Sequence, residues 1–450
     1  MSELKSLSEK IKNKTATICV IGLGYVGLPT ALSFAENGFT VLGADINARI
    51  VDLINCGGCH LTDLDLGVRI KKVVQDNKLS ATTNTTEATK KSDVILIVVP
   101  TPVTPDKRPD LTPVINASED IARGLDKGKL VVLESTVYPG VTDDILKPIF
   151  EKNGLIAGVD FGLAHCPERY NPGDSKHTIS DVVRVVGGIT PECGEITSML
   201  YKNIVKDIFY VKDIKTAEAA KIIENIQRDL NIALMNELAL IFERMNIDII
   251  DVVKAASTKW NFNTYYPGAG VGGHCLPVDP YYLVKKAEEL GYHSKVILAG
   301  RAVNDYMPIH IYELLVDALN EREKPMKNSK IVILGFSYKE NVGDPRESPV
   351  ESFINELKKG KADIHIIDPY IDHGYLDTYG IYERDIYKAL ESADAVVLMT
   401  AHKEFKNIDL AKVKSLMRTP ILIDGRRIYD RMAVLSMGFT YRGIGAINTN

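Results

Sequence analysis

The sequence predicts an α/β protein in which two Rossmann-like, doubly wound parallel-sheet domains are joined by a long central helix. Apolar runs of strand length alternate with helix-length segments in the first part of the chain, and the same alternation returns near the C-terminus. Between the two series lies a long stretch without proline or glycine. We expect three domains, at residues 1–214, 215–325 and 326–450.

The first domain opens with a strand, a helix and a second strand. An apolar run from Thr15 leads into a glycine cluster, and a second run over residues 40–44 ends at Asp45. Further runs cover residues 93–99, 130–133 and 182–186. Strands that alternate with helices pair in parallel, so we expect one sheet covered by helices on both faces.

Apolar spacing also predicts the helices and strands of the central and C-terminal parts of the chain. Residues 216–246 keep apolar side chains at helical spacing, which predicts one long helix and a face for a homodimer. A glycine-rich loop at residues 267–273 precedes further helix to about residue 322, and polar residues around Pro325 predict a linker. The apolar runs of the C-terminal sheet are residues 330–337, 362–367, 395–399 and 420–423. Only Gly335 remains there of a dinucleotide fingerprint, so we expect a smaller ligand.

Composition and charge limit the classes of partner. The 450 residues are 45% hydrophobic and 25% charged, as in an average globular protein of several domains. A net charge of -5 provides no basic excess for nucleic acid or an anionic membrane. The polar N-terminus resembles neither a signal peptide nor a membrane span, so we expect a cytoplasmic protein whose six cysteines stay reduced.

The strongest local motif is Gly22-Leu-Gly24-Tyr-Val-Gly27, directly after the first strand. Gly22 allows a tight turn, Gly24 lets a pyrophosphate approach the backbone, and Gly27 allows the helix to pack closely on the sheet. Asp45 would accept hydrogen bonds from ribose hydroxyls and repel a 2′-phosphate. We therefore expect NAD, although Arg49 could tolerate the phosphate of NADP. A glycine turn without a ligand is the alternative.

A second motif, GAGVGGHCLPVDP, places Cys275 after a glycine cluster and before two prolines. Glycines give a substrate access to the backbone, and prolines stiffen the loop. A buried, inert cysteine is the alternative. Beside a hydride acceptor, however, a thiol can add to the aldehyde formed by a first oxidation. The thiohemiacetal can then lose a second hydride and leave a thioester that water hydrolyses.

Three further residues could support this chemistry. Lys221 and Asn225 lie one helical turn apart on the predicted long helix, so both could stabilise an oxyanion from one face. Glu168, in AHCPERYNPG, could orient or deprotonate the hydrolytic water. A solvated lysine and a surface ion pair of the glutamate are the alternatives.

The segment Cys56-Gly-Gly-Cys59-His60 matches the attachment motif of haem c. Haem attachment requires export, and no second pair of ligands has suitable spacing for a metal. We therefore expect a glycine-rich turn with two incidental thiols, and no metal site.

These motifs resemble those of the UDP-glucose/GDP-mannose dehydrogenase family over nearly the whole chain. The matching segments are GLGYVGLP, VPTP, ESTVYPG, CPERYNPG, AEAAKIIEN, GVGGHCLPVDP, GFSYKENVGDPRESP and DGRR. The resemblance implies an NAD-dependent enzyme that oxidises the C6 alcohol of a nucleotide sugar to the uronic acid through thiohemiacetal and thioester intermediates.

The resemblance also implies roles for single residues. The implied catalytic residues are Cys275, Lys221, Asn225, Glu168, Asp279 and Thr136. The implied cofactor-binding residues are Gly22, Gly24, Tyr25, Val26, Gly27, Asp45, Arg49, Pro100, Thr101, Thr136 and Arg346. The implied substrate-binding residues are Glu168, Arg169, Lys221, Asn225, Gly272, Gly273, Lys339 and Arg426. Asp279 and Lys221 would assist proton transfer, and Arg426 would meet the nucleotide within one chain or across a subunit boundary.

Within this family the chain is most similar to the UDP-N-acetylhexosamine 6-dehydrogenases of surface polysaccharide pathways, which act on UDP-GalNAc or UDP-GlcNAc. The segments behind this are PDLTPVINASE, NPGDSKHTI, IQRDLNIALMNELA and STKWNF. UDP-N-acetylmannosamine and UDP-glucose are the alternative substrates. The UDP-N-acetylmannosamine branch usually has His-Pro-Arg near residues 259–261, where this chain has Lys-Trp-Asn. The UDP-glucose branch often has an acidic residue where Pro172 stands. Both differences favour the UDP-GalNAc or UDP-GlcNAc branch.

Two other function classes remain: a two-electron hydroxyacid dehydrogenase and a binding protein that has lost catalysis. Cys275 and the extra C-terminal domain argue against the first class, and the full set of catalytic candidates argues against the second. We expect the UDP-sugar between the C-terminal domain and the long helix, near Cys275, in a homodimer or larger homo-oligomer.

Overall fold

The computed structural model describes residues 3–61, 64–169 and 179–447. Pro172 and most of the segment NPGDSKHTI lie outside the described residues. Contacts within the chain divide it into two compact units. The first unit contains Met1–Glu224 and Tyr281–Tyr292, and the second contains Asn225–Pro280 and His293–Asn450.

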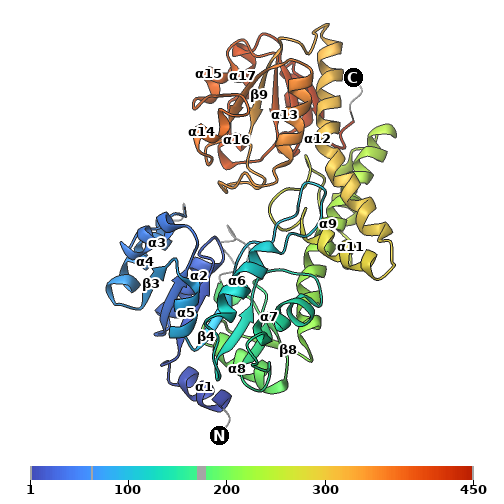
Figure 1. Cartoon of the computed structure of the whole chain (residues 1–450). Helices are drawn as coiled ribbons and strands as arrows, with labels where there is room; N and C mark the ends of the chain where they lie inside the picture. Colours follow the sequence, from blue (N-terminus) through green and yellow to red (C-terminus); the bar gives the residue numbers. More distant parts are fainter. Residues whose placement is uncertain (1–2, 62–63, 170–178, 448–450) are drawn as a thin grey trace. The chain divides into compact units, whose positions relative to one another are not determined.

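The first unit is built on an eight-stranded sheet of order β3-β2-β1-β4-β5-β6-β7-β8 (Figure 1). Its strands are β1 (Thr17–Ile21), β2 (Thr40–Ala44), β3 (Leu79–Thr82), β4 (Val94–Ile97), β5 (Leu130–Leu133), β6 (Gly162–His165), β7 (Arg184–Gly188) and β8 (Ile208–Val211). All neighbouring strands are parallel except β6 and β7. Every residue of β4 and β5 is buried, which is typical of parallel strands covered on both faces.

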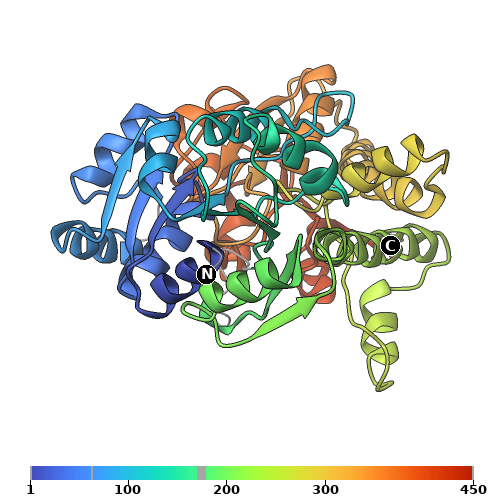
Figure 2. The same cartoon turned by 60° about the horizontal axis from the view of Figure 1, so that its bottom comes forward.

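Helices connect the strands of the first unit. They are α1 (Glu3–Lys12), α2 (Gly27–Glu36), α3 (Ala48–Asn55), α4 (Leu64–Gln75), α5 (Thr85–Lys91), α6 (Thr112–Ala122), α7 (Lys147–Glu151) and α8 (Pro191–Tyr201), with a π-helical turn (Val141–Leu146) and a 3-10 turn (Ile179–Asp181). Asn47 and Asn84 cap α3 and α5 with their side chains, which fixes where these helices begin. Helix α1 packs against α8, and they lie side by side in both views (Figure 1 and Figure 2).

The second unit contains a six-stranded, fully parallel sheet of order β11-β10-β9-β12-β13-β14. Its strands are β9 (Lys330–Leu334), β10 (Asp363–Ile367), β11 (Ile381–Tyr382), β12 (Ala395–Leu398), β13 (Ile421–Asp424) and β14 (Thr440–Gly443). The strand order reverses between β9 and β12, as it does between β1 and β4 in the first sheet. Both sheets therefore have the switch point at which α/β proteins bind ligands.

Long helices dominate the rest of the second unit. The helices from α9 onward are α9 (Ile214–Arg244), α10 (Ile249–Ala256), α11 (Asp279–Glu289), α12 (Lys295–Glu321), α13 (Pro349–Lys359), α14 (His373–Leu376), α15 (Ile386–Leu390), α16 (Lys403–Lys406), α17 (Leu410–Leu416) and α18 (Arg431–Ser436). Helix α9 begins in the first unit and continues into the second, and most of α11 belongs to the first. Helices α12 and α13 pack against each other, and α12 also contacts β13 and β14.

The predicted fold class is confirmed, with two doubly wound α/β sheets and one long helix. The helix expected at residues 216–246 is α9, displaced by two residues. The antiparallel β7 was not expected, because an apolar run predicts a strand but not its direction.

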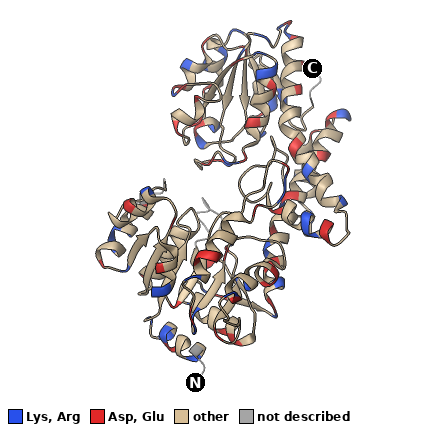
Figure 3. Ribbon diagram, viewed as in Figure 1, with Lys and Arg blue, Asp and Glu red and all other residues tan. Residues whose placement is uncertain are grey.

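Charged residues of both signs are distributed along the described elements (Figure 3). Lys and Arg are interspersed with Asp and Glu along the ribbon of each unit (Figure 3). No helix among the described residues is both long and apolar enough to cross a membrane.

Candidate active site

The glycine loop after β1 has the shape that a dinucleotide requires. Gly22 has a φ of +92°, and a Cβ there would lie 2.5 Å from the carbonyl oxygen of Val98. A Cβ on Gly27 would lie 1.8 Å from the carbonyl oxygen of Gly22, so the helix can approach the turn only without a side chain. A Cβ on Gly24, by contrast, would meet nothing within 4 Å. Gly24 therefore offers bare backbone to a ligand, and the loop fits a pyrophosphate.

Asp45 links this loop to the end of β2. One carboxylate oxygen accepts a hydrogen bond from the backbone N–H of Leu23 at 2.8 Å, and the other accepts one from Asn47 at 2.9 Å. The side chain is only partly buried, so its remaining lone pairs can reach ribose hydroxyls. Arg49 lies exposed in the first turn of α3.

The other cofactor residues predicted in this unit lie at the same edge of the sheet: Tyr25 and Val26 before α2, Pro100 and Thr101 after β4, and Thr136 after β5. The hydroxyl of Ser135 donates to the carbonyl oxygen of Val99 at 2.7 Å, which ties the two loops together. The carboxyl ends of three neighbouring parallel strands thus form one binding edge.

Glu168 follows β6 and belongs to a buried cluster of charged side chains. The guanidinium of Arg184, the first residue of β7, is completely buried and pairs with the carboxylates of both Glu168 and Glu134. The hydroxyl of Tyr201 donates to Glu134 at 2.6 Å. Glu168 is therefore not the surface ion pair that its residue type alone would favour.

Burial and charge act against each other in this cluster. Burial raises the pKa of Glu134 to about 7, while the Arg184 guanidinium opposes that shift. Burial alone would lower the pKa of Arg184. The carboxylates of Glu168 and Glu134 have the larger, opposite effect, so the pKa lies well above its usual value. Arg184 therefore stays charged and holds the Glu168 loop against the sheet.

Lys221 of α9 lies close to the same loop. It is half-buried, and it lowers the pKa of His165, although burial is the main reason that this pKa falls to about 3. His165, the last residue of β6, is therefore neutral. Arg169 pairs with Glu224 of α9 at 2.7 Å, which attaches the loop to the helix. Sequence analysis missed His165, whose one signal is its position in AHCPE.

In the second unit, a hydrogen bond connects α9 to the loop that carries Cys275, residues 268–280, which we call the thiol loop. The amide of Asn225 donates to the carboxylate of Asp279 at 2.6 Å, and both side chains are buried. The carbonyl oxygen of Cys275 accepts from the N–H groups of Val278 at 3.0 Å and Asp279 at 2.8 Å. Asp279 therefore starts α11 one turn from Cys275, whose side chain is half-buried.

The glycines before the thiol permit close packing against the segment after β9. A Cβ on Gly272 would lie 2.6 Å from the carbonyl oxygen of Glu347, and one on Gly273 would lie 2.7 Å from the ring of Tyr338. Gly273 has a φ of +93°, and its N–H donates to the carbonyl oxygen of Arg346 at 3.2 Å. Two tight contacts thus fix the backbone that carries Cys275.

Three cations that are predicted to bind ligands lie in the second unit. The guanidinium of Arg346 donates three hydrogen bonds to Asp344, at 2.9, 3.1 and 2.6 Å, and stays partly exposed. Lys339 is half-buried in the segment after β9. Arg426 follows β13, and a Cβ on Gly268 would lie 2.6 Å from its Nη1. Cations of this kind suit a diphosphate.

Each unit thus holds part of the predicted set. The first unit holds Gly22, Gly24, Tyr25, Val26, Gly27, Asp45, Arg49, Pro100, Thr101, Thr136, Glu168, Arg169 and Lys221. The second unit holds Asn225, Gly272, Gly273, Cys275, Asp279, Lys339, Arg346 and Arg426.

The haem-like segment forms a turn at the end of α3. The N–H of Cys56 donates to the carbonyl oxygen of Asp52 at 3.1 Å, and Gly57 has a φ of +75°. Across the described part of the chain, no three His, Cys, Asp or Glu side chains are arranged to hold a metal ion.

Comparison with known proteins places these features in one family. Three models of the UDP-glucose/GDP-mannose dehydrogenase family match the chain: the NAD binding domain at residues 16–205, the central domain at 215–306 and the UDP binding domain at 332–431.

Curated relatives cover nearly the full chain. A UDP-N-acetyl-D-glucosamine 6-dehydrogenase from Pseudomonas aeruginosa is 41% identical over 421 residues, which are 93% of this chain and 98% of the relative. A UDP-N-acetyl-D-mannosamine dehydrogenase from Pyrococcus horikoshii is 36% identical over 428 residues, which are 95% of this chain and 99% of the relative.

Solved structures agree with this. That of the UDP-D-ManNAc dehydrogenase from Pyrococcus horikoshii has a TM-score of 0.88 at 36% identity and covers 96% of this chain and 100% of its own. The structure of an NDP-N-acetyl-D-galactosaminuronic acid dehydrogenase from Methanosarcina mazei has a TM-score of 0.84 at 31% identity. It covers 100% of this chain and 98% of its own. NAD is the cofactor that the first domain's family and the glycine loop both support. This chain belongs to the UDP-glucose/GDP-mannose dehydrogenase family and is an NAD-dependent nucleotide-sugar dehydrogenase.

Proposed function

We propose that this enzyme oxidises the C6 alcohol of a UDP-N-acetylhexosamine to the uronic acid, with UDP-GlcNAc or UDP-GalNAc as the substrate and surface polysaccharide as the destination of the product. The observation that carries the reaction is Cys275, a half-buried thiol on a tightly packed glycine loop next to the hydrogen-bonded pair Asn225 and Asp279.

The choice of sugar is supported by the relatives. Two relatives at 41% and 39% identity are named UDP-N-acetyl-D-glucosamine 6-dehydrogenases, from Pseudomonas aeruginosa and Salmonella typhi. The N-acetylmannosamine enzymes of Pyrococcus horikoshii and Campylobacter jejuni are both 36% identical. Epimers differ by a few polar contacts, so a modest difference in pocket residues separates these substrates.

The chemistry of Cys275 follows from what an aldehyde needs for a second oxidation. NAD, when bound at the glycine loop, accepts the hydride in each oxidation. The thiolate of Cys275 adds to the aldehyde carbon, and the oxygen that becomes negative is stabilised by the Lys221 ammonium and the Asn225 amide. Loss of the hydrogen at that carbon as a hydride, with re-formation of the C=O bond, leaves a thioester on Cys275.

Hydrolysis of the thioester requires a base that takes a proton from the attacking water. The carboxylate of Glu168 takes a proton from the attacking water, and Arg184 keeps that carboxylate fixed. The C–S bond breaks as the C–O bond forms, and the sulfur leaves as thiolate. Asp279 and Lys221 assist proton transfer, while Lys339, Arg346 and Arg426 hold the phosphates of the two ligands.

A stoichiometric assay tests this proposal. The purified enzyme is given UDP-GlcNAc, UDP-GalNAc, UDP-ManNAc and UDP-glucose in parallel, and NADH and uronic acid are measured per sugar consumed. We expect about two NADH per N-acetylglucosamine or N-acetylgalactosamine sugar. One NADH with a released aldehyde would exclude the thioester, and turnover confined to UDP-ManNAc or UDP-glucose would overturn the substrate assignment.

Asp45 provides a direct test of the cofactor contact. Replacing Asp45 by alanine is expected to weaken NAD binding at least about tenfold, because hydrogen bonds from ribose hydroxyls to a carboxylate are lost. Binding of the UDP-sugar should stay unchanged. Calorimetric titration of both ligands measures this, with Asp52→Ala on the exposed face of α3 as control. Unchanged NAD affinity in Asp45→Ala would remove the ribose assignment.

We also propose that the enzyme is a homodimer, or a larger homo-oligomer, that pairs through α9. Leu234 and Ile241, two turns apart on one face of α9, are 49% and 44% exposed. Such an apolar stripe suits a second copy of the same helix. Leu234→Asp is expected to produce monomers in sedimentation velocity, whereas Arg228→Asp, at an exposed position away from this stripe, should not. A monomeric wild-type enzyme would contradict this.

A further inference from the structure

Lys339 lies in a loop after β9 that is held by a buried network of hydrogen bonds. We call residues 336–341 the lysine loop. The network is built on Asp368, directly after β10, and His402, directly before α16. These two residues are 1% and 0% exposed, and neither belongs to the predicted site. They cannot touch a ligand, so any effect on the reaction passes through the loop.

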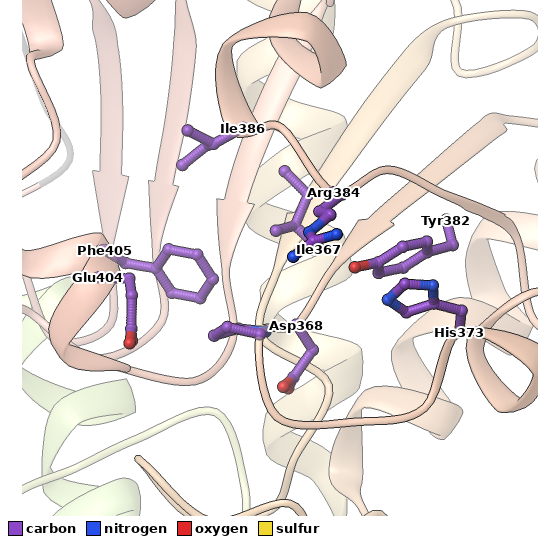
Figure 4. A pocket seen from close by; sticks show the side chains of 9 residues that line it. Ile367, Asp368, His373, Tyr382, Arg384, Ile386, Glu404 and Phe405 are labelled. Atoms are coloured by element: carbon purple, nitrogen blue, oxygen red, sulfur yellow. The ribbon is translucent and has the colours of Figure 1, made fainter.

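The carboxylate of Asp368 holds the first end of the lysine loop. One oxygen accepts hydrogen bonds from the N–H groups of Phe336 and Ser337 and from the Ser337 hydroxyl, each at 2.8 Å. Asp368 is also one of the residues around a cavity of about 440 Å³, which Figure 4 shows. Because its carboxylate is buried and bonded to the loop, Asp368 orders the protein's own backbone and not a ligand of that cavity.

The imidazole of His402 connects this carboxylate to the other end of the loop. Its Nδ1 lies 2.8 Å from the backbone nitrogen of Asn341 and accepts the N–H. A ring nitrogen that accepts a hydrogen bond carries no proton, so the proton of the neutral ring is on Nε2. That nitrogen lies 3.0 Å from the Asp368 carboxylate and donates to it. Each ring nitrogen of His402 thus has one partner, and a single tautomer satisfies both.

Two more hydrogen bonds close the network around the loop. The side-chain oxygen of Asn341 accepts from the N–H of Lys403 at 3.0 Å, and the hydroxyl of Thr400 donates to the carbonyl oxygen of Ser337 at 2.5 Å. Asn341 has a φ of +61°, a conformation that asparagine adopts more readily than most residues. The backbone is therefore fixed two residues before Lys339 and two residues after it.

The contact between the lysine loop and the thiol loop has separate support. The N–H of Tyr338 donates to the carbonyl oxygen of Asp344 at 3.2 Å. Gly273 of the thiol loop lies against the Tyr338 ring and donates its N–H to the carbonyl oxygen of Arg346. None of these bonds involves His402. A change in the network should therefore displace the lysine and leave the thiol loop in place.

We propose that His402 is a positioning residue for the nucleotide sugar: by accepting the N–H of Asn341, it holds the lysine loop so that the Lys339 ammonium meets a phosphate. The inference rests on the proposed role of Lys339. Without the acceptor on His402, the loop has to be ordered when the UDP-sugar binds, and that entropic cost lowers the affinity. The N–H of Asn341 would also lack a partner, which favours conformations in which the loop opens to water.

Two substitutions of similar size separate the two hydrogen bonds of His402. His402→Asn keeps a polar atom at the place of Nδ1, so it can still accept the N–H of Asn341, but it is too short to reach Asp368. His402→Gln keeps a donor at the place of Nε2 and can still reach Asp368, but it offers no acceptor to Asn341. The positioning role requires the first bond, so His402→Asn should rescue what His402→Gln loses.

Steady-state kinetics measures this difference. We expect the KM for the UDP-sugar to rise at least about tenfold in His402→Gln and less than about threefold in His402→Asn, with kcat nearly unchanged in both. A general loss of packing would instead affect both variants alike. Equal changes in KM, or a loss confined to kcat, would overturn the proposal.

Calorimetric titration of the full chain with UDP measures the same contact without turnover. The affinity for UDP should fall at least about tenfold in His402→Gln and in Lys339→Ala. If Lys339→Ala binds UDP as tightly as the wild type, the role of Lys339 is wrong, and the proposal falls with it. If Lys339→Ala weakens UDP binding and His402→Gln does not, only the positioning role is wrong.

Asn341→Gly tests the same end of the loop from an exposed position. Glycine tolerates the positive φ and keeps the N–H, but the bond to Lys403 is lost, so UDP should bind at least about threefold more weakly. This variant takes the place of His402→Gln if that chain fails to fold, and unchanged UDP affinity would then contradict the proposal.

His365→Gln is the matched control. His365 is a mostly buried histidine of β10 that pairs with Asp363 at 3.3 Å and lies outside the network. Its replacement should leave UDP affinity unchanged. A loss equal to that in His402→Gln would show a general effect of removing a buried histidine and would refute the positioning role.

Discussion

Cys275→Ser is expected to lower uronic acid formation at least about a thousandfold. A serine hydroxyl is almost never ionised near neutral pH, so it adds to the aldehyde far more slowly than a thiolate does. It is also similar in size to the thiol, so the packing of Gly272 and Gly273 should survive. Binding of NAD and UDP-sugar should therefore stay nearly unchanged while turnover is lost.

Two measurements separate this outcome from a general defect. Calorimetry gives the affinity for each ligand, and mass spectrometry of the quenched wild-type enzyme should find the acyl adduct on the peptide that contains Cys275. Cys56→Ser, at the exposed turn after α3, is the matched control and should keep full activity. Full activity in Cys275→Ser would remove the thioester mechanism.

Arg184→Met is expected to lower the free energy of unfolding by about 3 kcal/mol or more. Methionine retains much of the volume but no charge, so the carboxylates of Glu134 and Glu168 would be left buried without their cation. Arg123→Met, which removes an exposed arginine paired with Asp120, should change stability by about 0.5 kcal/mol or less.

The loss of stability in Arg184→Met should be larger at high pH than at low pH. Burial already raises the pKa of Glu134 to about 7, and removal of the opposing guanidinium raises that pKa further. A carboxyl group with a higher pKa in the folded chain stabilises it at low pH and loses this effect as the pH rises through the folded-state pKa. Urea unfolding should therefore show a larger deficit at about pH 8 than at about pH 5.

A double variant identifies the cause. Arg184→Met with Glu134→Gln leaves only one buried carboxylate, so part of the lost stability should return. If the double variant is no more stable than Arg184→Met, packing and not charge explains the loss.

Much of the fold and the local motifs could be predicted from the sequence because the relevant physics is local. Apolar runs of strand and helix length predict the two sheets and α9. The turn at Gly22 requires a positive φ, and the close approach at Gly27 excludes a side chain, so glycine spacing alone indicates the dinucleotide loop. The same reasoning selects Cys275 from six cysteines, since its neighbours are glycines and prolines in a set pattern.

The sequence by itself determined the fold class, the cofactor loop, the thiol loop and the family. Only the tertiary structure decided which charges are buried and what they contact: Arg184 between Glu134 and Glu168, and Asp279 against Asn225. These partners are far apart in the chain, and neither pairing nor a shifted pKa is encoded in a local pattern. Both depend on the low dielectric and the neighbours that folding creates.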